Sequence, residues 1–315
     1  MSTNLYDFDL VSIIIPIFNS EKYILKCLNS LKQQSYSNIE VIIVNDGSTD
    51  NTKTICQDYI IYDKRFHLIN TQHMGVSHAR NVGIKLSKGQ FILFVDGDDF
   101  VSYDYVETLV RSIKVYNVDL VCTDYYTVEN NEIDYGFSNK KTEILDNTEV
   151  LDNIAAINLL HNDKYFRGYL WNKIFVKQII IANNLTFNTE IKIWEDMLFC
   201  LEYLLCIKNV AYVRKCIYYY VIHSNSTMNN KKIWEEQTQL KAIEQMWKLL
   251  QPIDGAFKIY IRDYYANLLA GLIGKSFFCD ENSVIKKIKN LHGKLTFRHI
   301  IKISMYSLCS IIYKK

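Results

Sequence analysis

The sequence contains no run of about 18 uncharged apolar residues, so we expect no transmembrane helix. Its opening segment, Met1–Asp9, carries neither the basic stretch nor the apolar stretch of an export signal. Neither sign of charge dominates, because 36 lysines and arginines stand against 34 aspartates and glutamates, for a formal charge of +2. The chain as a whole therefore has no electrostatic bias toward nucleic acid.

Cysteines at metal-binding or redox spacing are also absent. The eight cysteines are scattered at positions 27, 56, 122, 200, 206, 216, 279 and 309, and no two form a Cys-x-x-Cys pair. Without an export signal, this pattern favours reduced thiols in a cytoplasmic protein. Internal repeats and low-complexity tracts are absent as well.

Basic charge is concentrated at the C-terminal end. Residues 284–315 contain eight lysines or arginines and no acid, with apolar residues such as Phe297 and Ile301 between them. This mixture resembles an interfacial segment attracted to anionic lipid, so we expect peripheral contact with the inner face of the cell membrane. The alternative is a terminal helix that packs its apolar side on the protein and leaves its lysines in solvent.

Strands and helices alternate through the first 125 residues. Apolar runs predict strands at 10–17, 39–45, 66–70, 91–95 and 119–122, and the stretches between them predict helices at 21–33, 50–62, 77–86 and 103–116. This alternation is typical of parallel βαβ units in a doubly wound α/β sheet.

The alternation fades after residue 125. The polar segment 129–147 is expected to form a hairpin or a loop, with helices at 147–160, 171–184 and 194–207, strands at 210–213 and 216–222, and further helices beyond 229 that break near Pro252 and Gly255. We place a boundary near residue 225. It separates a nucleotide-binding α/β domain, residues 1–225, from a helical region, residues 226–315.

An acidic cluster follows the fourth expected strand, in Val95-Asp96-Gly97-Asp98-Asp99. Open α/β sheets bind ligands at the carboxyl ends of their strands. Three carboxylates there would repel one another without a cation, and oxygen ligands suit Mg²⁺ or Mn²⁺ together with a phosphate. The alternative is an acidic turn that caps the next helix.

A second polar motif, Asn45-Asp46-Gly47-Ser48-Thr49-Asp50, follows the second expected strand. It has strong turn chemistry, and Ser48, Thr49 or Asp50 can cap the following helix. Asp46 is expected to reach the same crevice as the acidic cluster. A carboxylate there can accept a hydrogen bond from a nucleobase N–H, such as N3–H of uracil.

Charged residues also stand at two later helix starts. In Gly75-Val76-Ser77-His78-Ala79-Arg80, Ser77 is the expected N-cap, and Arg80 is unfavourable for the helix dipole unless an anion lies nearby. A solvated arginine is the alternative. Glu195 and Asp196, after Trp194, suit the first turn of a helix, but one of them can instead be a general base.

Together these motifs closely resemble family 2 of the glycosyltransferases, in the inverting GT-A form typical of bacterial capsule and exopolysaccharide clusters. The matching segments, in the family's order, are 11–19, 45–50, 77–83, 95–99 and 195–199, so the resemblance covers about residues 10–225. Where the family commonly has Asn-Gly-Gly before Val-Ser, this chain has Gln72-His73-Met74-Gly75. The resemblance implies a GT-A fold, a Rossmann-like mixed sheet flanked by helices, followed by a C-terminal helical extension.

The resemblance assigns donor binding to six matching positions: Pro16, Asn19, Asp46, Arg80, Asp96 and His223. Asp46 would read uracil, Arg80 would lie beside the nucleotide, and Asp96 would contact the ribose or the outer shell of a metal. His223 belongs to a Tyr220-x-x-His223-x-x-Ser226 segment that would fold over the diphosphate. A strand end with turn residues is the alternative for that segment.

The remaining roles concern the metal and the acceptor. Asp98 would ligate Mn²⁺ or Mg²⁺, and Asp196 would be the base, with Glu195 beside it. Asp99 would orient the acceptor or support its loop. Trp171, in Trp-Asn-Lys, would line the acceptor side or belong to the core.

The implied reaction is transfer of a hexose or N-acetylhexosamine from a UDP-sugar to a glycan, such as a lipid-linked repeat unit, with a β-glycosidic bond as product. Two other classes stay open. A sugar nucleotidyltransferase would show a glycine-rich loop after the first strand, which Ile17-Phe18-Asn19-Ser20 does not provide. An inactive scaffold would keep Asp46 but lose the metal or base carboxylate, and both are present.

Overall fold

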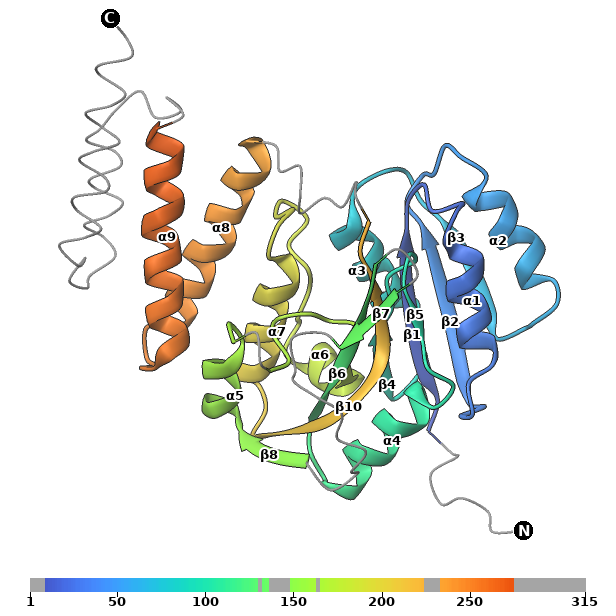
Figure 1. Ribbon diagram of the computed structural model, residues 1–315, viewed down its shortest axis with the longest axis horizontal. Coiled ribbons are helices and arrows are strands. Elements are labelled where there is room, and N and C mark those ends of the chain that lie inside the picture. The colour runs from blue at the N-terminus through green and yellow to red at the C-terminus, as the bar shows by residue number, and fades with distance from the viewer. Residues whose placement is uncertain (1–8, 130–131, 136–147, 163–164, 224–232, 275–315) are drawn as a thin grey trace, which may run out of the picture.

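The computed structural model describes residues 9–129, 132–135, 148–162, 165–223 and 233–274 (Figure 1). Its first half alternates strands and helices as the sequence predicts. The elements are β1 (Val11–Ile17), α1 (Ile24–Lys32), β2 (Ile39–Asn45), α2 (Thr52–Ile60), β3 (Phe66–Asn70), α3 (Val76–Leu86), β4 (Phe91–Phe94), β5 (Phe100–Val101), α4 (Tyr105–Val115) and β6 (Leu120–Glu129).

The second half mixes short strands with longer helices. Its elements are β7 (Glu132–Tyr135), β8 (Thr148–Asp152), α5 (Asn153–Leu159), β9 (Lys173–Val176), α6 (Lys177–Ala182), α7 (Glu195–Leu205), β10 (Asn209–Val221), α8 (Ile233–Leu249) and α9 (Ala256–Gly274). The helical break expected near Pro252 and Gly255 lies between α8 and α9.

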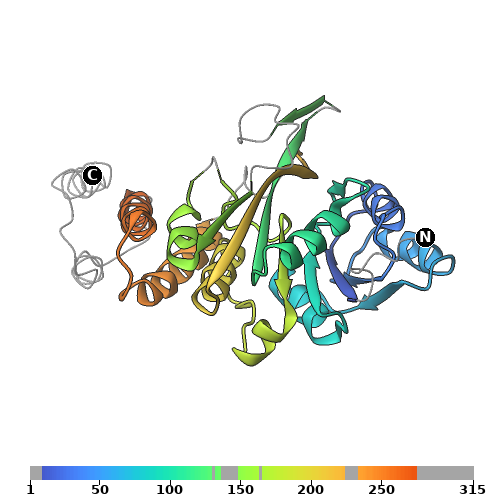
Figure 2. The same ribbon diagram turned by 90° about the horizontal axis from the view of Figure 1, so that it is seen from below.

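The strands form one mixed sheet in the order β3-β2-β1-β4-β9-β6-β10-β5, with β7 added to β6 and β8 added to β10. β1 to β4 are parallel to their neighbours in this group, and β6 is parallel to β10. β9 runs antiparallel to both β4 and β6 and joins the two parallel groups into one sheet. The hairpin of β6 and β7 extends beyond the rest of the sheet in Figure 2.

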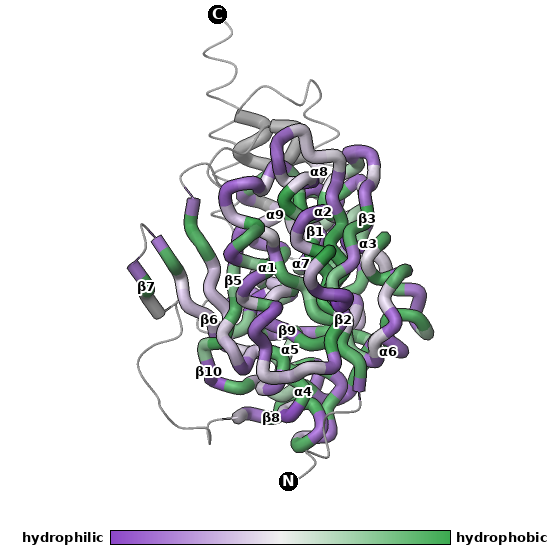
Figure 3. Tube along the Cα trace, turned by 90° about the vertical axis from the view of Figure 1, so that its right-hand side faces the viewer, coloured by the Kyte–Doolittle hydropathy of each residue, from purple (hydrophilic) through white to green (hydrophobic). Residues whose placement is uncertain are grey.

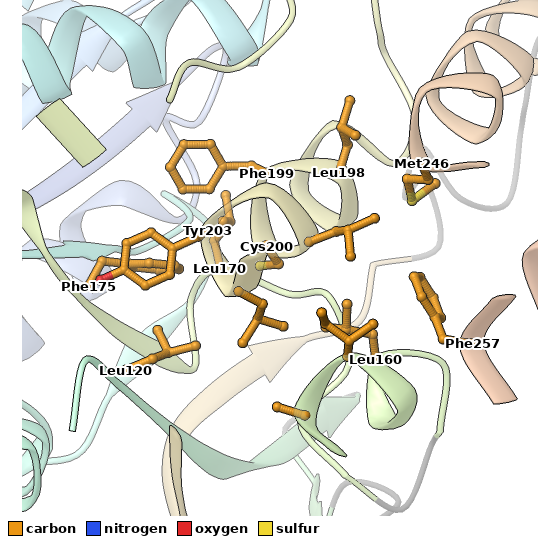
Figure 4. Close-up of a cluster of buried hydrophobic side chains, with 14 of the residues drawn as sticks. Leu120, Leu160, Leu170, Phe175, Leu198, Phe199, Cys200, Tyr203, Met246 and Phe257 are labelled. Carbon is orange, nitrogen blue, oxygen red and sulfur yellow. The ribbon is translucent and has the colours of Figure 1, made fainter. Parts of the chain in front are cut away.

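The sheet separates two hydrophobic clusters. Every residue of β1 and β2 is buried, and Figure 3 shows both strands as largely hydrophobic. Successive side chains of a strand point to opposite faces. Ile13 and Ile15 of β1 accordingly join the cluster under α1 and α4, whereas Ile14 joins the cluster under α5 and α7, part of which Figure 4 shows.

Helix α3 lies very close to the sheet because residue 83 is glycine. A Cβ added there would stand 2.3 Å from Cγ2 of Ile14. Such a contact is far shorter than packed atoms allow, so a side chain would push α3 away from β1. The close approach places the buried Arg80, one turn earlier in α3, near the carboxyl end of β4.

The C-terminal helices α8 and α9 pack against α7 and α5. Ile243, Met246, Phe257 and Ile261 belong to the same buried cluster as Leu201 of α7, and Figure 4 shows Met246 and Phe257 in it. The boundary expected near residue 225 and the basic segment 284–315 lie outside the described residues. Across the ranges that are described, we find no helix with the length and hydropathy needed to cross a membrane.

The helix expected at 171–184 is wrong in its first part. Residues Lys173–Val176 form β9, which fills the gap between β4 and β6, and only Lys177–Ala182 are helical. The three apolar residues after Lys173 are too few for their periodicity to separate a buried strand from the start of a helix. The long-range pairing of β9 with two strands decides the matter.

Two other expectations need correction for similar reasons. The helix expected at 147–160 begins only at Asn153, because Thr148–Asp152 pair with β10, and Asp152 caps the helix through the N–H of Ala155 at 2.7 Å. The two strands expected at 210–222 are one strand, β10, with shifts of register near Val213 and Cys216.

Candidate functional site

Three loops at the carboxyl ends of β1, β2 and β4 form the floor of the candidate site. Asn19, after β1, has a left-handed backbone with φ of 51°, and its side-chain oxygen accepts a hydrogen bond from the N–H of Thr49 at 2.8 Å. Ser48 Oγ accepts from the N–H of Asn19 at 3.0 Å. Pro16 lies in β1 opposite Val44 of β2. Asn19 therefore joins the loops that follow β1 and β2.

Asp46 is buried and holds the loop 71–75. Its two carboxylate oxygens accept hydrogen bonds from the N–H groups of Met74, at 2.9 Å, and Gly75, at 2.7 Å. Nδ1 of His73 lies 2.9 Å from the same carboxylate, and its ring stacks on Phe18 with 4.1 Å between centroids. The predicted contact of Asp46 with uracil stays a prediction. The structure adds that this carboxylate also sets the shape of the neighbouring loop.

The helix starts differ from the capping roles expected for Ser77 and for the Asn45–Asp50 motif. Gly75, with φ of 96°, is the N-cap of α3, and Ser77 instead donates toward the carbonyl of Ile191 at 3.5 Å. At α2 the N-cap is Asn51, whereas Asp50 accepts from the N–H of Thr52 at 3.0 Å. The left-handed backbone at position 75 explains why a glycine is needed there.

The three acids after β4 have different surroundings. Asp99 is buried and accepts hydrogen bonds from Tyr218 Oη and the N–H of Val221, both at 2.7 Å. Burial, and next the charge of Asp98, raise the pKa of the Asp99 carboxyl well above its usual value. These bonds join the acidic loop to β10, which is one of the two roles expected for Asp99.

Asp98 is partly buried and lies beside Asp96 and His223. Partial burial of the carboxyl, and next the charge of Asp96, raise the pKa of Asp98 to about 6. Nε2 of His223 lies 3.5 Å from Oδ2 of Asp98, is itself buried, and makes no hydrogen bond within the described residues. The His223 ring stands against Tyr23, with 4.2 Å between centroids.

These residues fit a divalent cation as one or two ligands, not as a complete cage. The part of the chain that the structure describes contains no group of three or more His, Cys, Asp or Glu side chains arranged around a common point. Mg²⁺-type sites commonly use one or two carboxylates and take their other ligands from water and phosphate. Asp98, with the buried imidazole nitrogen of His223 facing it, suits such a partial site.

Arg80 is neither solvated nor unpaired. Its Nη1 donates to Oε1 of Glu195 at 2.8 Å, and its Nη2 lies 3.4 Å from Oδ1 of Asp96. The guanidinium therefore connects the end of β4 with the start of α7, and Glu195 lies 115 residues after Arg80 in the chain. This arrangement removes the conflict with the helix dipole and corrects the alternative of a solvated arginine.

Glu195 and Asp196 are adjacent in sequence but differ in partners. Glu195 is held by Arg80, whereas Asp196 is partly exposed and has no side-chain partner among the described residues, and its Oδ1 accepts only from the N–H of Met197. Burial, and next the charge of Glu195, raise the pKa of Asp196 to about 7, against the opposing effect of Arg80. A carboxylate with these properties suits proton transfer near neutral pH.

Trp171 has the surroundings of a core residue. It is 5% exposed and stacks between Tyr169, with centroids 4.8 Å apart, and Tyr218, with centroids 4.4 Å apart. The sequence left the acceptor side and the core as alternatives. The packing favours the core, although Tyr169 and Tyr220 around it are partly exposed.

Two residues near the site were missed in the sequence. Tyr218 donates to Asp99 and accepts from the N–H of Asp96 at 3.2 Å, so it ties β10 to the acidic loop. Lys173 is fully buried, and its Nζ donates to the carbonyls of Phe166, Arg167 and Tyr169 and to Oδ1 of Asn172, at 2.5 to 3.0 Å. The signal for a structural role of Lys173 was its position at the start of an apolar strand.

Comparisons with known proteins identify relatives of the chain. The model of the family "Glycosyl transferase family 2" matches residues 12–173, just over half of the chain. The glycosyltransferase GlyA of Streptococcus pneumoniae serotype 4 is 31% identical over 245 residues, and EpsH of Bacillus subtilis strain 168 is 32% identical over 240 residues. These matches cover 76% and 71% of this chain, but the chain spans only 34% of GlyA and 65% of EpsH.

Solved structures show the same architecture. Staphylococcus aureus TarS 1–349 in complex with UDP-GlcNAc has a TM-score of 0.67 and 21% identity, covering 96% of this chain and 91% of that one. The mannosyltransferase PcManGT of Pyrobaculum calidifontis, in complex with GDP-Man and Mn²⁺, has a TM-score of 0.58 and 14% identity, covering 96% and 86%. At these identities the likeness concerns the fold, and it confirms the GT-A fold expected from the sequence.

Proposed function

Because the chain belongs to glycosyl transferase family 2, we propose that it moves a hexose or N-acetylhexosamine from a UDP-sugar to a glycan acceptor with inversion at the anomeric carbon. Inversion of an α-linked donor forms a β-glycosidic bond. The observation that carries the proposal is the bridge from Asp96 through Arg80 to Glu195, because it brings Asp196 to the crevice at the strand ends. A single displacement needs a base and a donor site at one place.

Asp196 is the proposed base. It would take the proton of the acceptor hydroxyl as that oxygen attacks the anomeric carbon. Arg80 holds Glu195 as an ion pair, and the charge of Glu195 helps to raise the pKa of the neighbouring Asp196. Because of the ion pair with Arg80, Glu195 has a structural role and Asp196 has the proposed chemical role.

The donor would lie over the loops that follow β1, β2 and β4. Asn19, Asp46 and the loop 71–75 form one hydrogen-bonded unit there, which suits the nucleotide, and TarS carries UDP-GlcNAc in a chain of the same fold. Pro16 lies in the strand that leads to this unit. Arg80 and Asp96 would lie on the sugar and diphosphate side.

A divalent cation would be held by Asp98 with support from His223, and PcManGT carries Mn²⁺ in a chain of the same fold. When bound, such an ion neutralises negative charge on a departing nucleotide diphosphate. His223 would keep Asp98 oriented toward the donor through its imidazole.

The acceptor is proposed to be a lipid-linked glycan at the inner face of the cell membrane. The basic and apolar mixture in residues 284–315 supports this part of the proposal. In this view residues 1–225 are the catalytic domain, and residues 226–315 are a helical region that approaches the membrane.

The first test is UDP release by the purified chain from a panel of UDP-sugars, with water as the only acceptor, with and without Mn²⁺. We expect slow release from one donor that depends on Mn²⁺. The control variant Asp98→Asn, which keeps the shape of the side chain but loses its charge, should release little UDP at any Mn²⁺ concentration. No release by the wild-type chain, with no UDP binding by calorimetry, would support the inactive scaffold.

Membrane contact is tested separately. Deletion of residues 284–315 should release the chain from vesicles that contain anionic lipid, because about 1 kcal/mol of attraction per basic residue near the surface is lost. Neutral vesicles serve as the control, and UDP affinity measures whether the catalytic domain is intact. Equal binding of both chains to anionic vesicles would contradict the proposed membrane role.

A further inference from the structure

Trp194, the residue before α7, has a backbone conformation that is sterically unfavourable for a bulky side chain. Its φ of 71° and ψ of 18° lie in the left-handed region. Three of the other four non-glycine residues with positive φ in the described ranges are asparagines, which tolerate this region, but a bulky aromatic residue does not. Trp194 is the N-cap of α7 and offers no side-chain hydrogen bond to the helix. Contacts from elsewhere must therefore hold it.

Those contacts come from the two C-terminal helices. The Trp194 ring packs against Tyr264 of α9, with 4.3 Å between centroids, and lies 6.2 Å from Tyr260, one turn earlier. Tyr264 Oη accepts a hydrogen bond from the buried Gln239 of α8 at 3.2 Å. The N–H of Lys192 donates to Oγ1 of Thr238 in α8 at 3.1 Å. Helix α8 therefore contacts residue 192, and α9 contacts residue 194.

The segment held in this way leads directly into the acids of the site. Glu195, the next residue, forms the 2.8 Å pair with Arg80, and Asp196 follows it. The N–H of Leu198 donates to the carbonyl of Trp194 at 3.0 Å, so residue 194 also closes the first turn of α7. A change of φ at residue 194 would redirect the chain where these acids begin.

We propose that α9 positions the catalytic carboxylate. Tyr264 and Tyr260 hold Trp194 in its left-handed conformation and so fix the position of Asp196. Trp194 and Tyr264 are positioning residues, since neither would touch the substrate. The inference rests on the proposed role of Asp196 as the base. It assigns to the C-terminal helices a task in turnover beyond the burial of apolar surface.

Glycine and alanine at position 194 separate this task from simple packing. Both variants lose the ring, but glycine adopts the left-handed region freely and alanine does not. We expect Trp194→Gly to turn over about 5–30-fold faster than Trp194→Ala, the ratio that corresponds to the left-handed penalty of about 1–2 kcal/mol. Trp194→Gly should also melt at a higher temperature. If the ring only fills space, alanine should equal or exceed glycine in both measurements.

Tyr264 supplies the second test. Tyr264→Leu should lower kcat about tenfold, within the range that positioning effects reach, whereas Tyr264→Phe, which keeps the ring against Trp194 but loses the bond to Gln239, should lower kcat less. The affinity for UDP, measured by calorimetry, should not change. In an Asp196→Asn background, Tyr264→Leu should have no further effect on kcat, because the group that it positions is gone.

The measurements separate the inference about α9 from the proposed role of Asp196 as the base. A fall in UDP affinity that matches the fall in kcat for Tyr264→Leu would indicate general loosening of the fold and would overturn the inference. Wild-type turnover in Asp196→Asn would instead overturn the proposed base. In that case the melting temperatures of the glycine and alanine variants still test whether residue 194 requires the left-handed region, because they do not depend on the chemistry.

Discussion

Replacement of Asp196 by asparagine should lower turnover by about 10²–10⁴-fold, the range expected for loss of a general base, while UDP affinity stays near that of the wild-type chain. Asparagine has the same shape, and its side-chain oxygen can still accept the hydrogen bond from the N–H of Met197. What it lacks is the capacity to take a proton. The measurement is kcat with the preferred donor, together with the Kd of UDP by calorimetry.

A second carboxylate on the same helix provides the control. Glu202 lies in α7, is partly buried and makes none of the contacts of the site. Glu202→Gln removes one charge from α7 and should leave kcat near the wild-type value. Equal turnover in the wild-type and Asp196→Asn chains would remove Asp196 as the base.

The pH dependence gives the same residue a second signature. Burial and the charge of Glu195 disfavour the ionised form of Asp196, so its pKa rises to about 7 and the base is lost as pH falls below that value. We therefore expect kcat to fall on the acid side of about pH 7, and the residual activity of Asp196→Asn to lose this limb.

Stability should respond to pH in the opposite direction. The folded state binds the proton of Asp196 more tightly than the unfolded state, where the pKa is near 3.9, so this group favours folding most at low pH. Its contribution decreases as pH rises through about 7. Asp196→Asn should remove this part of the decrease in melting temperature.

Replacement of Arg80 by methionine should destabilise the fold by about 3–5 kcal/mol, the cost of removing one partner of a buried ion pair. The Arg80 side chain is 8% exposed and that of Glu195 is 11% exposed, so water cannot solvate the carboxylate that is left behind. Methionine keeps most of the length and apolar character of the arginine stem. Chemical unfolding in urea measures the loss.

Two further variants separate the charge from the packing. Arg80→Met combined with Glu195→Gln should recover part of the loss, because the unpaired charge is removed as well. Arg214 pairs with Glu149 on the surface, where exposed pairs contribute about 0–1 kcal/mol, so Arg214→Met should cost far less. A loss of only about 1 kcal/mol for Arg80→Met would show that its ion pairs are not a structural bridge.

Much of the fold was predictable because its first half repeats one simple unit. Buried apolar runs separated by amphipathic stretches allow few arrangements besides parallel βαβ units. The site residues at the strand ends follow from the same rule, since Asp46 and Asp96 stand directly after buried strands. The sequence indicated either an anion near Arg80 or a solvated arginine, and it did not identify Glu195, the partner that the structure places there.

What could not be predicted depends on contacts between distant segments. β9 and β8 are strands only because neighbouring strands pair with them, and their own sequences carry no clear period. The left-handed Trp194 has no local signal at all, because its conformation is held by a helix about 70 residues later in the chain. Such features are set by the packing of the complete chain.

The lengths of the strands also bear on how readily the edges of the sheet can pair with a second copy of the chain. The long strands β1, β2, β6 and β10 have 7, 7, 10 and 13 residues, whereas the outlying strands β3, β5, β7 and β8 have 5, 2, 4 and 5. Long unpaired edges invite a second copy to add its own strand, and short edges with charged side chains do not. Glu149 on β8, already paired with Arg214, adds such a charge. The short outer strands of this broad sheet therefore present few unpaired backbone groups to which a second copy could add a strand.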